Sequence, residues 1–188
     1  MRLFSVFLGL TVLTEIFANL ASGPLRWATN WPIYNSFMLP EYILYTLFFR
    51  SIIHNQRIKK VLNGFLVLIP IVWVISSFWL LGITVWNSYM VLIGDSLTIF
   101  MCTCYMYEFF LSEDEIDIKT SAEFWIAAST FMYACCEVPI TGRLNYLAAH
   151  NEQATNWLLV ILEILNIIMY LTILYAYQCR RLINIMSS

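Results

Sequence analysis

Five acidic side chains, each in a different long apolar segment, are the residues of this chain best placed to do chemistry. They are Glu15, Glu41, Asp95, Glu137 and Glu163. A carboxylate in hydrocarbon costs several kcal/mol or more, so such a residue is usually paired, protonated or functional. A set of five indicates a binding site.

Three chemical roles remain open for these acids. They could be protonated and hydrogen-bonded to one another or to nearby amides, bind a cation, or line a wet cavity. Oxygen ligands without histidine favour a hard ion such as Ca²⁺, Mg²⁺ or Na⁺, or an organic amine, over zinc. The alternative is that the acids are neutral and only hold helices together by hydrogen bonds. We predict that the ligand or ion is bound by Glu15, Glu41, Asp95, Glu137, Glu163, Asn19 and Asn166. The sequence assigns no catalytic residue, no metal-ligand set and no cofactor.

The composition of the chain decides what kind of elements carry these acids. Of its 188 residues, 61% are hydrophobic and only 12% are charged, whereas a soluble domain carries about 25% charged residues. The net charge of -2, without a basic stripe or a zinc finger, argues against a nucleic-acid partner. We therefore expect an integral membrane protein whose main partner is the lipid bilayer.

A bilayer core requires about 20 apolar residues per helix. The sequence contains six such segments, at residues 3–22, 33–53, 61–82, 86–111, 122–142 and 156–178. The first resembles a signal peptide, but Glu15 within its apolar run favours a retained helix. The predicted fold is an all-α, polytopic helical bundle that forms one transmembrane domain over residues 1–188.

The distribution of Lys and Arg predicts the direction of these helices. With both termini in the cytoplasm, eight cations lie inside, namely Arg2, Arg50, Arg57, Lys59, Lys60, Lys119, Arg180 and Arg181. Only Arg26 and Arg143 then lie in the outer loops, where either could fold over the carboxylates. The five acids would lie roughly 5–9 residues, or about 8–13 Å, below the outer edge of the membrane. No Lys or Arg lies at that depth.

The spacing of the acids predicts three helical hairpins. Glu41 follows Glu15 by 26 residues, and Glu163 follows Glu137 by 26 residues. In the middle hairpin, Ser76 and Ser77 take the place of the acid on the outgoing helix. Parallel repeats of this kind occur in transporters, with sites at the repeat interface.

Other polar residues have simpler expected roles. Asn35 and Asn87 begin their segments among aromatic residues, as interfacial anchors do. The two histidines, His54 and His150, are expected in surface loops. The five cysteines lack metal or redox spacing and are expected to be buried small residues: Cys102, Cys104, Cys135, Cys136 and Cys179. Three prolines, Pro40, Pro70 and Pro139, predict helix bends.

A resemblance covers roughly the first half of the chain. The pair Thr14-Glu15, the run Ile33-Tyr34-Asn35, Glu41 and the run 86–89 (Trp-Asn-Ser-Tyr) follow one another in apolar surroundings. In this pattern the chain is similar to small, uncharacterised polytopic proteins of the bacterial inner membrane with six to seven helices. Members often have one more helix before the first. The resemblance implies a multi-pass protein of the inner membrane and carries no activity.

Three functions fit these expectations. The first is a membrane binding or conducting module, such as a channel, transporter subunit or sensor, for a cation, proton or small polar ligand. The second is an intramembrane acid–base enzyme acting on a lipid or isoprenoid. The third is a membrane-permeabilising stress or defence effector. We favour the first over an enzyme because no nucleophile, base and orienting group form a recognisable set. With no soluble domain, its partners would be further copies of the chain or another membrane protein.

Overall fold

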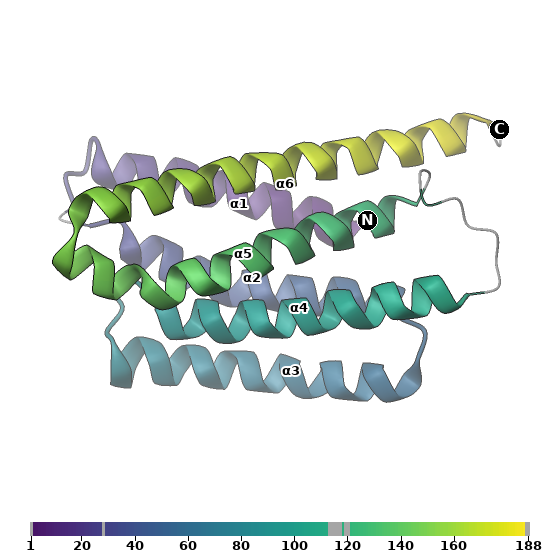
Figure 1. Ribbon diagram of the computed structural model, residues 1–188, viewed down its shortest axis with the longest axis horizontal. Coiled ribbons are helices and arrows are strands. Elements are labelled where there is room, and N and C mark those ends of the chain that lie inside the picture. The colour runs from purple at the N-terminus through teal and green to yellow at the C-terminus, as the bar shows by residue number, and fades with distance from the viewer. Residues whose placement is uncertain (1, 28, 113–117, 119–120, 187–188) are drawn as a thin grey trace. The chain divides into compact units, whose positions relative to one another are not determined.

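The computed structural model describes residues 2–27, 29–112, 118 and 121–186. Within these residues helices are the only regular elements, namely six α-helices and one π-helical turn (Figure 1). They are α1 (Arg2–Ser22), α2 (Trp31–Ile52), α3 (Gln56–Val74), η1 (Ile75–Leu80), α4 (Ser88–Leu111), α5 (Ala122–His150) and α6 (Glu152–Met186). Each predicted segment thus contains one α-helix, and the third also contains η1, which confirms the all-α prediction.

Five of these helices are long and apolar enough to cross a membrane, counted over the described residues, which is typical of a multi-pass membrane protein. These stretches are Leu3–Ser22, Gln56–Leu80, Ser88–Leu111, Ala122–Leu144 and Gln153–Gln178. Large apolar side chains remain exposed along them, including Phe17, Val67 and Ile167. Such exposure suits side chains that face lipid.

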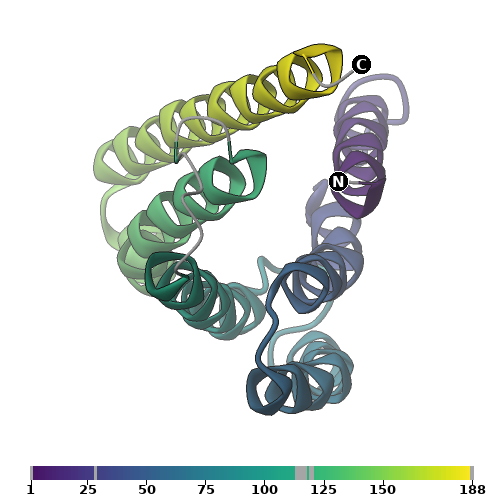
Figure 2. The same ribbon diagram turned by 90° about the vertical axis from the view of Figure 1, so that its right-hand side faces the viewer.

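The exception is α2, which has 22 residues but does not reach the same apolarity. It carries Asn35, Glu41 and Arg50. This helix packs against both α1 and α3, which lie beside it in both views (Figures 1 and 2). Because its neighbours cover much of its surface, α2 can hold polar residues away from lipid.

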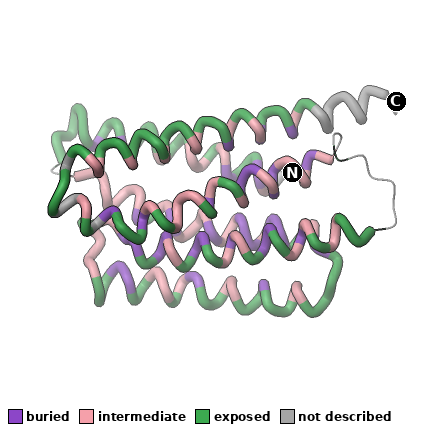
Figure 3. Tube along the Cα trace, in the orientation of Figure 1, coloured by how far each residue is buried: buried purple, intermediate pink, exposed green. Residues whose placement is uncertain are grey.

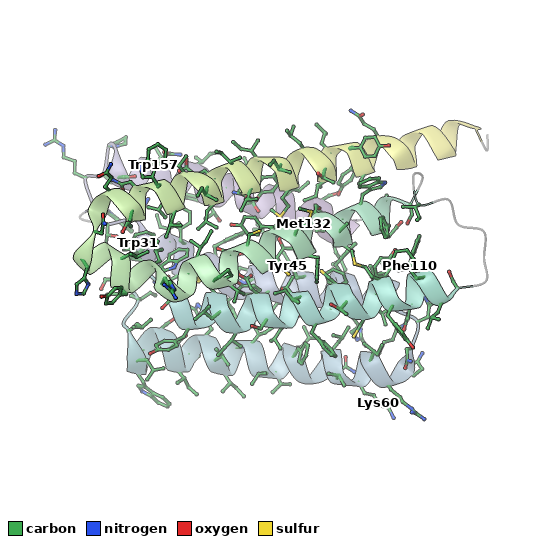
Figure 4. All side chains as sticks on the ribbon, in the orientation of Figure 1. Trp31, Tyr45, Lys60, Phe110, Met132 and Trp157 are labelled. Carbon is green, nitrogen blue, oxygen red and sulfur yellow. The ribbon has the colours of Figure 1, made fainter. Side chains whose placement is uncertain are left out.

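The chain divides into two compact units, residues 1–94 and 95–188, and α4 continues from the first into the second. In the first unit, aromatic rings of α1 and α2 form a core in which Phe4 and Phe7 lie 5.3 and 4.9 Å from the rings of Phe48 and Tyr45. In the second unit, α5 and α6 pack along each other. Much of α6 is exposed in Figure 3, and Trp157 lies near its start in Figure 4.

Several helix boundaries differ from the predictions, among them the end of α5 and the start of α6. Arg143 and His150 were expected in an outer loop, but α5 continues through both residues and α6 begins directly afterwards. The apolar run ends near residue 142, while helix propensity continues into the polar residues beyond it. Hydropathy reports the length of an apolar stretch and therefore misses this extension. His54 lies between α2 and α3, as expected.

Some predicted features lie outside the described residues. They are Lys119 and the side chains of Arg2, Cys179, Arg180 and Arg181.

Candidate functional site

Two polar groups stand out among the described side chains, one in each unit. The first, which we call the asparagine cluster, joins the start of α2 to the connection between η1 and α4. It consists of Asn35, Trp73, Ser76, Ser77 and Asn87. Asn35 and Asn87 are both 0% exposed, so both side chains lie inside the protein. Their predicted position at the membrane interface stays a prediction.

The side-chain amide of Asn35 hydrogen-bonds through both its nitrogen and its oxygen to the connection between η1 and α4. Its Nδ2 donates to the carbonyl oxygens of Ile83 and Val85 at 2.8 and 2.7 Å. Its Oδ1 accepts from the backbone N–H of Asn87 at 3.1 Å. The indole Nε1 of Trp73 donates to the Asn35 carbonyl at 2.6 Å. This one residue therefore ties α3 and the connection to α2.

The side-chain amide of Asn87 also hydrogen-bonds through both its nitrogen and its oxygen. Its Oδ1 accepts from the backbone N–H of Met90 at 3.1 Å and so caps the start of α4. Its Nδ2 donates to the hydroxyls of Ser76 and Ser77 at 2.8 and 2.9 Å. Both serines lie in the π turn, where the backbone N–H of Leu81 donates five residues back to Ser76. π turns interrupt α-helices often at functional sites.

The two asparagine side chains of the cluster have no hydrogen-bond donor left for a ligand. Each amide uses both of its N–H donors and its oxygen within the protein, which exhausts the donors of an asparagine side chain. A fully satisfied buried network makes a structure rigid and specific. We therefore assign this cluster to folding and look elsewhere for a ligand.

The second polar group contains two of the five predicted acids. Asp95 lies on α4 and is 5% exposed, and Glu137 lies on α5. Their side chains hydrogen-bond to each other, and Tyr133, one turn before Glu137, hydrogen-bonds to the same carboxyl. The thiol of Cys135 also lies near Asp95. We call Asp95 and Glu137 the carboxyl pair.

The carboxyl pair requires a proton. An ionised carboxylate has acceptor oxygens only, so two carboxyl groups can hydrogen-bond to each other only if one of them is protonated. Two bare negative charges in a buried position would repel each other and lose their hydration. A hydrogen bond between these two carboxyl groups is therefore consistent with one acidic proton held between α4 and α5.

Two hydroxyls on α5 accompany the carboxyl pair. Thr130 and Thr141 are each 2% exposed, and their Oγ1 atoms are buried without a hydrogen-bond partner among the described residues. Leaving a buried hydroxyl unsatisfied costs about 1–3 kcal/mol. Neither threonine was predicted as a site residue, although their spacing from Glu137 was a usable signal.

The other predicted site residues have separate positions. Glu15 is exposed on α1 and accepts a hydrogen bond from the Tyr34 hydroxyl at 3.1 Å. Asn19 donates to the backbone carbonyl of Glu15 at 2.9 Å. Glu41 is half-buried on α2. On α6, Glu163 is exposed and Asn166 is half-buried.

An apolar groove of about 420 Å³ lies at the junction of α1 and α2. Its lining contains no charged side chain, so it does not provide the predicted cation site, and it consists of Phe17, Ala21, Leu25, Trp27, Pro32, Ile33 and Ser36. Over the described part of the chain, no group of three or more His, Cys, Asp or Glu side chains is placed to hold a metal ion. Cys102, Cys104, Cys135 and Cys136 are free thiols; Cys135 is exposed, contrary to the expectation that all five cysteines are buried.

Comparison with known proteins found no matching family model, no matching curated protein and no matching solved structure.

Proposed function

We propose that this chain is a multi-pass membrane protein whose carboxyl pair, Asp95 with Glu137, binds and releases a proton, or a small cation in its place. The observation that supports this function is the hydrogen bond between the two carboxyl groups. This bond requires one proton between the two groups, and the proposed function is the release and return of that proton. The protein would thus be a binding or conducting module of the membrane.

The location of the carboxyl pair supports this function. Asp95 lies within the candidate span Ser88–Leu111, and Glu137 lies within the candidate span Ala122–Leu144. Both acids are thus about seven or more residues from the ends of their spans, at a depth that short acidic side chains do not bridge to water easily. Acids at such depth mark ion pathways and proton relays in pumps and transporters.

Loss of the proton changes what the pair can bind. With both groups ionised, the pair presents two negative charges and several acceptor oxygens to whatever replaces the proton. A small hard cation such as Na⁺ suits oxygen ligands better than zinc does. Proton and cation would then compete for the same oxygens, as they do wherever a carboxylate is the shared ligand.

We also propose a membrane topology, a location and partners for the protein. We propose six spans, with α2 as the second, and both termini in the cytoplasm, because the Lys and Arg bias favours this orientation. We place the chain in a bacterial inner membrane on its resemblance to small polytopic proteins. Its partners are lipid and further copies of the chain or another membrane protein.

Infrared spectroscopy of the full chain in lipid nanodiscs tests this function. A shared proton gives a carbonyl stretching band of a protonated carboxylic acid at neutral pH, which shifts in D₂O. We expect Glu137→Gln and Asp95→Asn each to remove that band, because each removes one partner of the pair. We expect added Na⁺, but not choline, to reduce it in the unmodified protein.

Glu163→Gln is the matched control, since it makes the same chemical change at an exposed acid of α6. It should leave the band of the carboxyl pair unchanged. The proposal fails if the unmodified protein lacks the band, or if the band persists in both pair variants.

A further inference from the structure

Thr130 and Thr141 stand on either side of Glu137 along one face of α5. Thr130 precedes Glu137 by seven residues and Thr141 follows it by four. Residues seven and four apart on an α-helix lie close to the same face, two turns and one turn away. A line of oxygen atoms therefore extends from the carboxyl pair toward both ends of the helix.

The hydroxyls of these two threonines behave differently from the others in the helices. Elsewhere a threonine hydroxyl donates back to the carbonyl oxygen four residues earlier, as in Thr11, Thr14, Thr46, Thr103 and Thr172. Thr130 and Thr141 do not do so, and their hydroxyls are buried without a partner within the described structure. Their side chains are thus turned away from the backbone bond that a threonine normally makes.

Packing does not explain a threonine at these positions. Valine has nearly the same shape and would fill the same space without a buried polar atom, whose unsatisfied state costs free energy. A polar occupant between the hydroxyls removes that cost. Water is the occupant that suits such positions, because buried water typically bonds to otherwise unsatisfied polar groups.

We infer that this face of α5 conducts protons to and from the carboxyl pair, through Thr130 on one side and Thr141 on the other. This inference rests on the proposed function and extends it by naming the proton as the species and conduction as the role. At each hydroxyl, an O–H bond forms to the arriving proton and the original O–H bond breaks. The number of protons on the hydroxyl is unchanged, and one proton has moved along the line.

The line ends at the start of α5, near Glu123. Glu123 precedes Thr130 by seven residues, which places it near the same face. It lies near Tyr105 of α4, whose hydroxyl hydrogen-bonds to Ser121, the residue that caps α5. A half-buried acid at a helix end can exchange protons with solvent.

The proton fits this arrangement better than a metal ion does. Ca²⁺ takes about 6–8 oxygen ligands at one point, whereas the oxygens of Thr130, Glu137 and Thr141 are spread over several helical turns. With water molecules between them, single oxygens spaced along one helix face can pass a proton from one to the next. Away from the carboxyl pair, this face offers too few oxygens at any one point to surround a metal ion.

Proton flux into liposomes tests this inference. The full chain is reconstituted in vesicles that contain a pH-sensitive dye, and a K⁺ diffusion potential drives protons inward. We expect the unmodified protein to conduct, and Thr130→Val and Thr141→Val each to lower the flux at least about tenfold, since a well-placed proton-transfer group contributes about 10²–10⁴-fold to a rate. Thr103→Val is the control, because the Thr103 hydroxyl is exposed and donates to the Ile99 carbonyl at 2.8 Å; it should retain its flux within about twofold.

Two further readouts separate conduction from folding and from proton binding. The midpoint of thermal unfolding should change little in Thr130→Val or Thr141→Val, because valine fills nearly the same space as threonine and neither hydroxyl bonds to another described group of the protein. The infrared band of the carboxyl pair should persist in both. If the band is present but the unmodified protein does not conduct, or both valine variants conduct normally, the inference is overturned and the proposed function stands. If the band is absent from the unmodified protein, both fall.

Discussion

The side-chain oxygen of Asn35 accepts a hydrogen bond from the backbone amide of Asn87 at 3.1 Å, although 52 residues separate them in the chain. This bond joins the first turns of α2 to the residue that caps α4. Through Asn87 it also extends to Ser76 and Ser77 in the π turn. Three segments of the first unit are therefore held at one buried point.

Asn87→Ala should destabilise the protein markedly. The variant loses the cap of α4 and the bonds to both serine hydroxyls, which it leaves buried at 1% and 0% exposure. We expect the free energy of unfolding to fall by about 2–4 kcal/mol, since loss of the cap costs about 0.5–2 kcal/mol and loss of the bond to the Ser77 hydroxyl costs about 1–3 kcal/mol. The Ser76 hydroxyl keeps its bond to the Trp73 carbonyl. Urea unfolding in mixed micelles, followed by tryptophan fluorescence, measures the change.

The control for this variant is Asn63→Ala. Asn63 is exposed on α3, so the same change there should alter the unfolding free energy by about 0.5 kcal/mol or less. Equal losses in the two variants would contradict the role of the asparagine cluster in folding.

Gly94 and Tyr42 form a close contact between α4 and α2. A methyl group added at Gly94 would overlap the ring of Tyr42, which is 4% exposed and cannot swing into open space. We expect Gly94→Ala to lower the unfolding free energy by about 1–3 kcal/mol, as overpacking does. In a double-mutant cycle, Tyr42→Leu should recover part of this loss by making room for the methyl group.

Gly64→Ala should change the unfolding free energy in the direction opposite to Gly94→Ala. Gly64 lies within α3, and nothing lies within 4 Å of the position that its methyl group would take. Alanine in a helix interior is favoured over glycine by about 0.5–1 kcal/mol. Gly64→Ala should therefore stabilise the protein in the same assay. Stabilisation by both alanines would refute the close contact at Gly94.

The Tyr133 hydroxyl should affect the infrared frequency of the carboxyl pair, but the pair should hold its proton without it. Its hydroxyl hydrogen-bonds to Glu137, and a carbonyl that loses a hydrogen bond absorbs at higher frequency. In Tyr133→Phe we expect the infrared band of the protonated carboxyl to move to higher frequency and to remain present. Tyr146→Phe is the control, since Tyr146 is 66% exposed and its ring stacks on His150 at 4.3 Å. An unshifted band in Tyr133→Phe would show that this hydroxyl does not act on the pair.

The helices were predictable from the sequence because their signal is local. A run of about 20 apolar residues is sufficient to identify a span, and each of the six predicted segments contains a helix. The third segment was predicted as one uninterrupted helix, but it consists of α3 followed by the π turn η1. Hydropathy does not show whether a backbone hydrogen bond joins residues four apart, as in an α-helix, or five apart, as in a π-helix. The π turn was therefore not predicted.

The polar contacts were predictable only in part because they depend on distant segments. Asp95 and Glu137 were recognised as acids in apolar surroundings, but their pairing depends on how α4 and α5 are rotated about their axes. The burial of Asn35 and Asn87 depends on a bond over 52 residues. Composition and spacing do not show which distant segments come into contact. The aromatic neighbours of Asn35 and Asn87 indicated only a position at the membrane interface.

The position of α2 gives the sharpest test of the topology. If all six helices cross the membrane, the two ends of the chain lie on the same side, whereas five crossings without α2 place them on opposite sides. We expect alkaline phosphatase to be inactive, and green fluorescent protein to be fluorescent, when fused at either end, because both ends are predicted to be cytoplasmic.

Single cysteines in the connections refine this test. The connection between α2 and α3 contains His54, and the connection between η1 and α4 contains Thr84; both residues are exposed. In a variant whose native cysteines are replaced by serine, Thr84→Cys should react with an impermeant maleimide added outside intact cells. His54→Cys should react only after the cells are opened, because six crossings place that connection inside. Labelling of His54→Cys in intact cells would show that α2 does not span the membrane as the second of six helices.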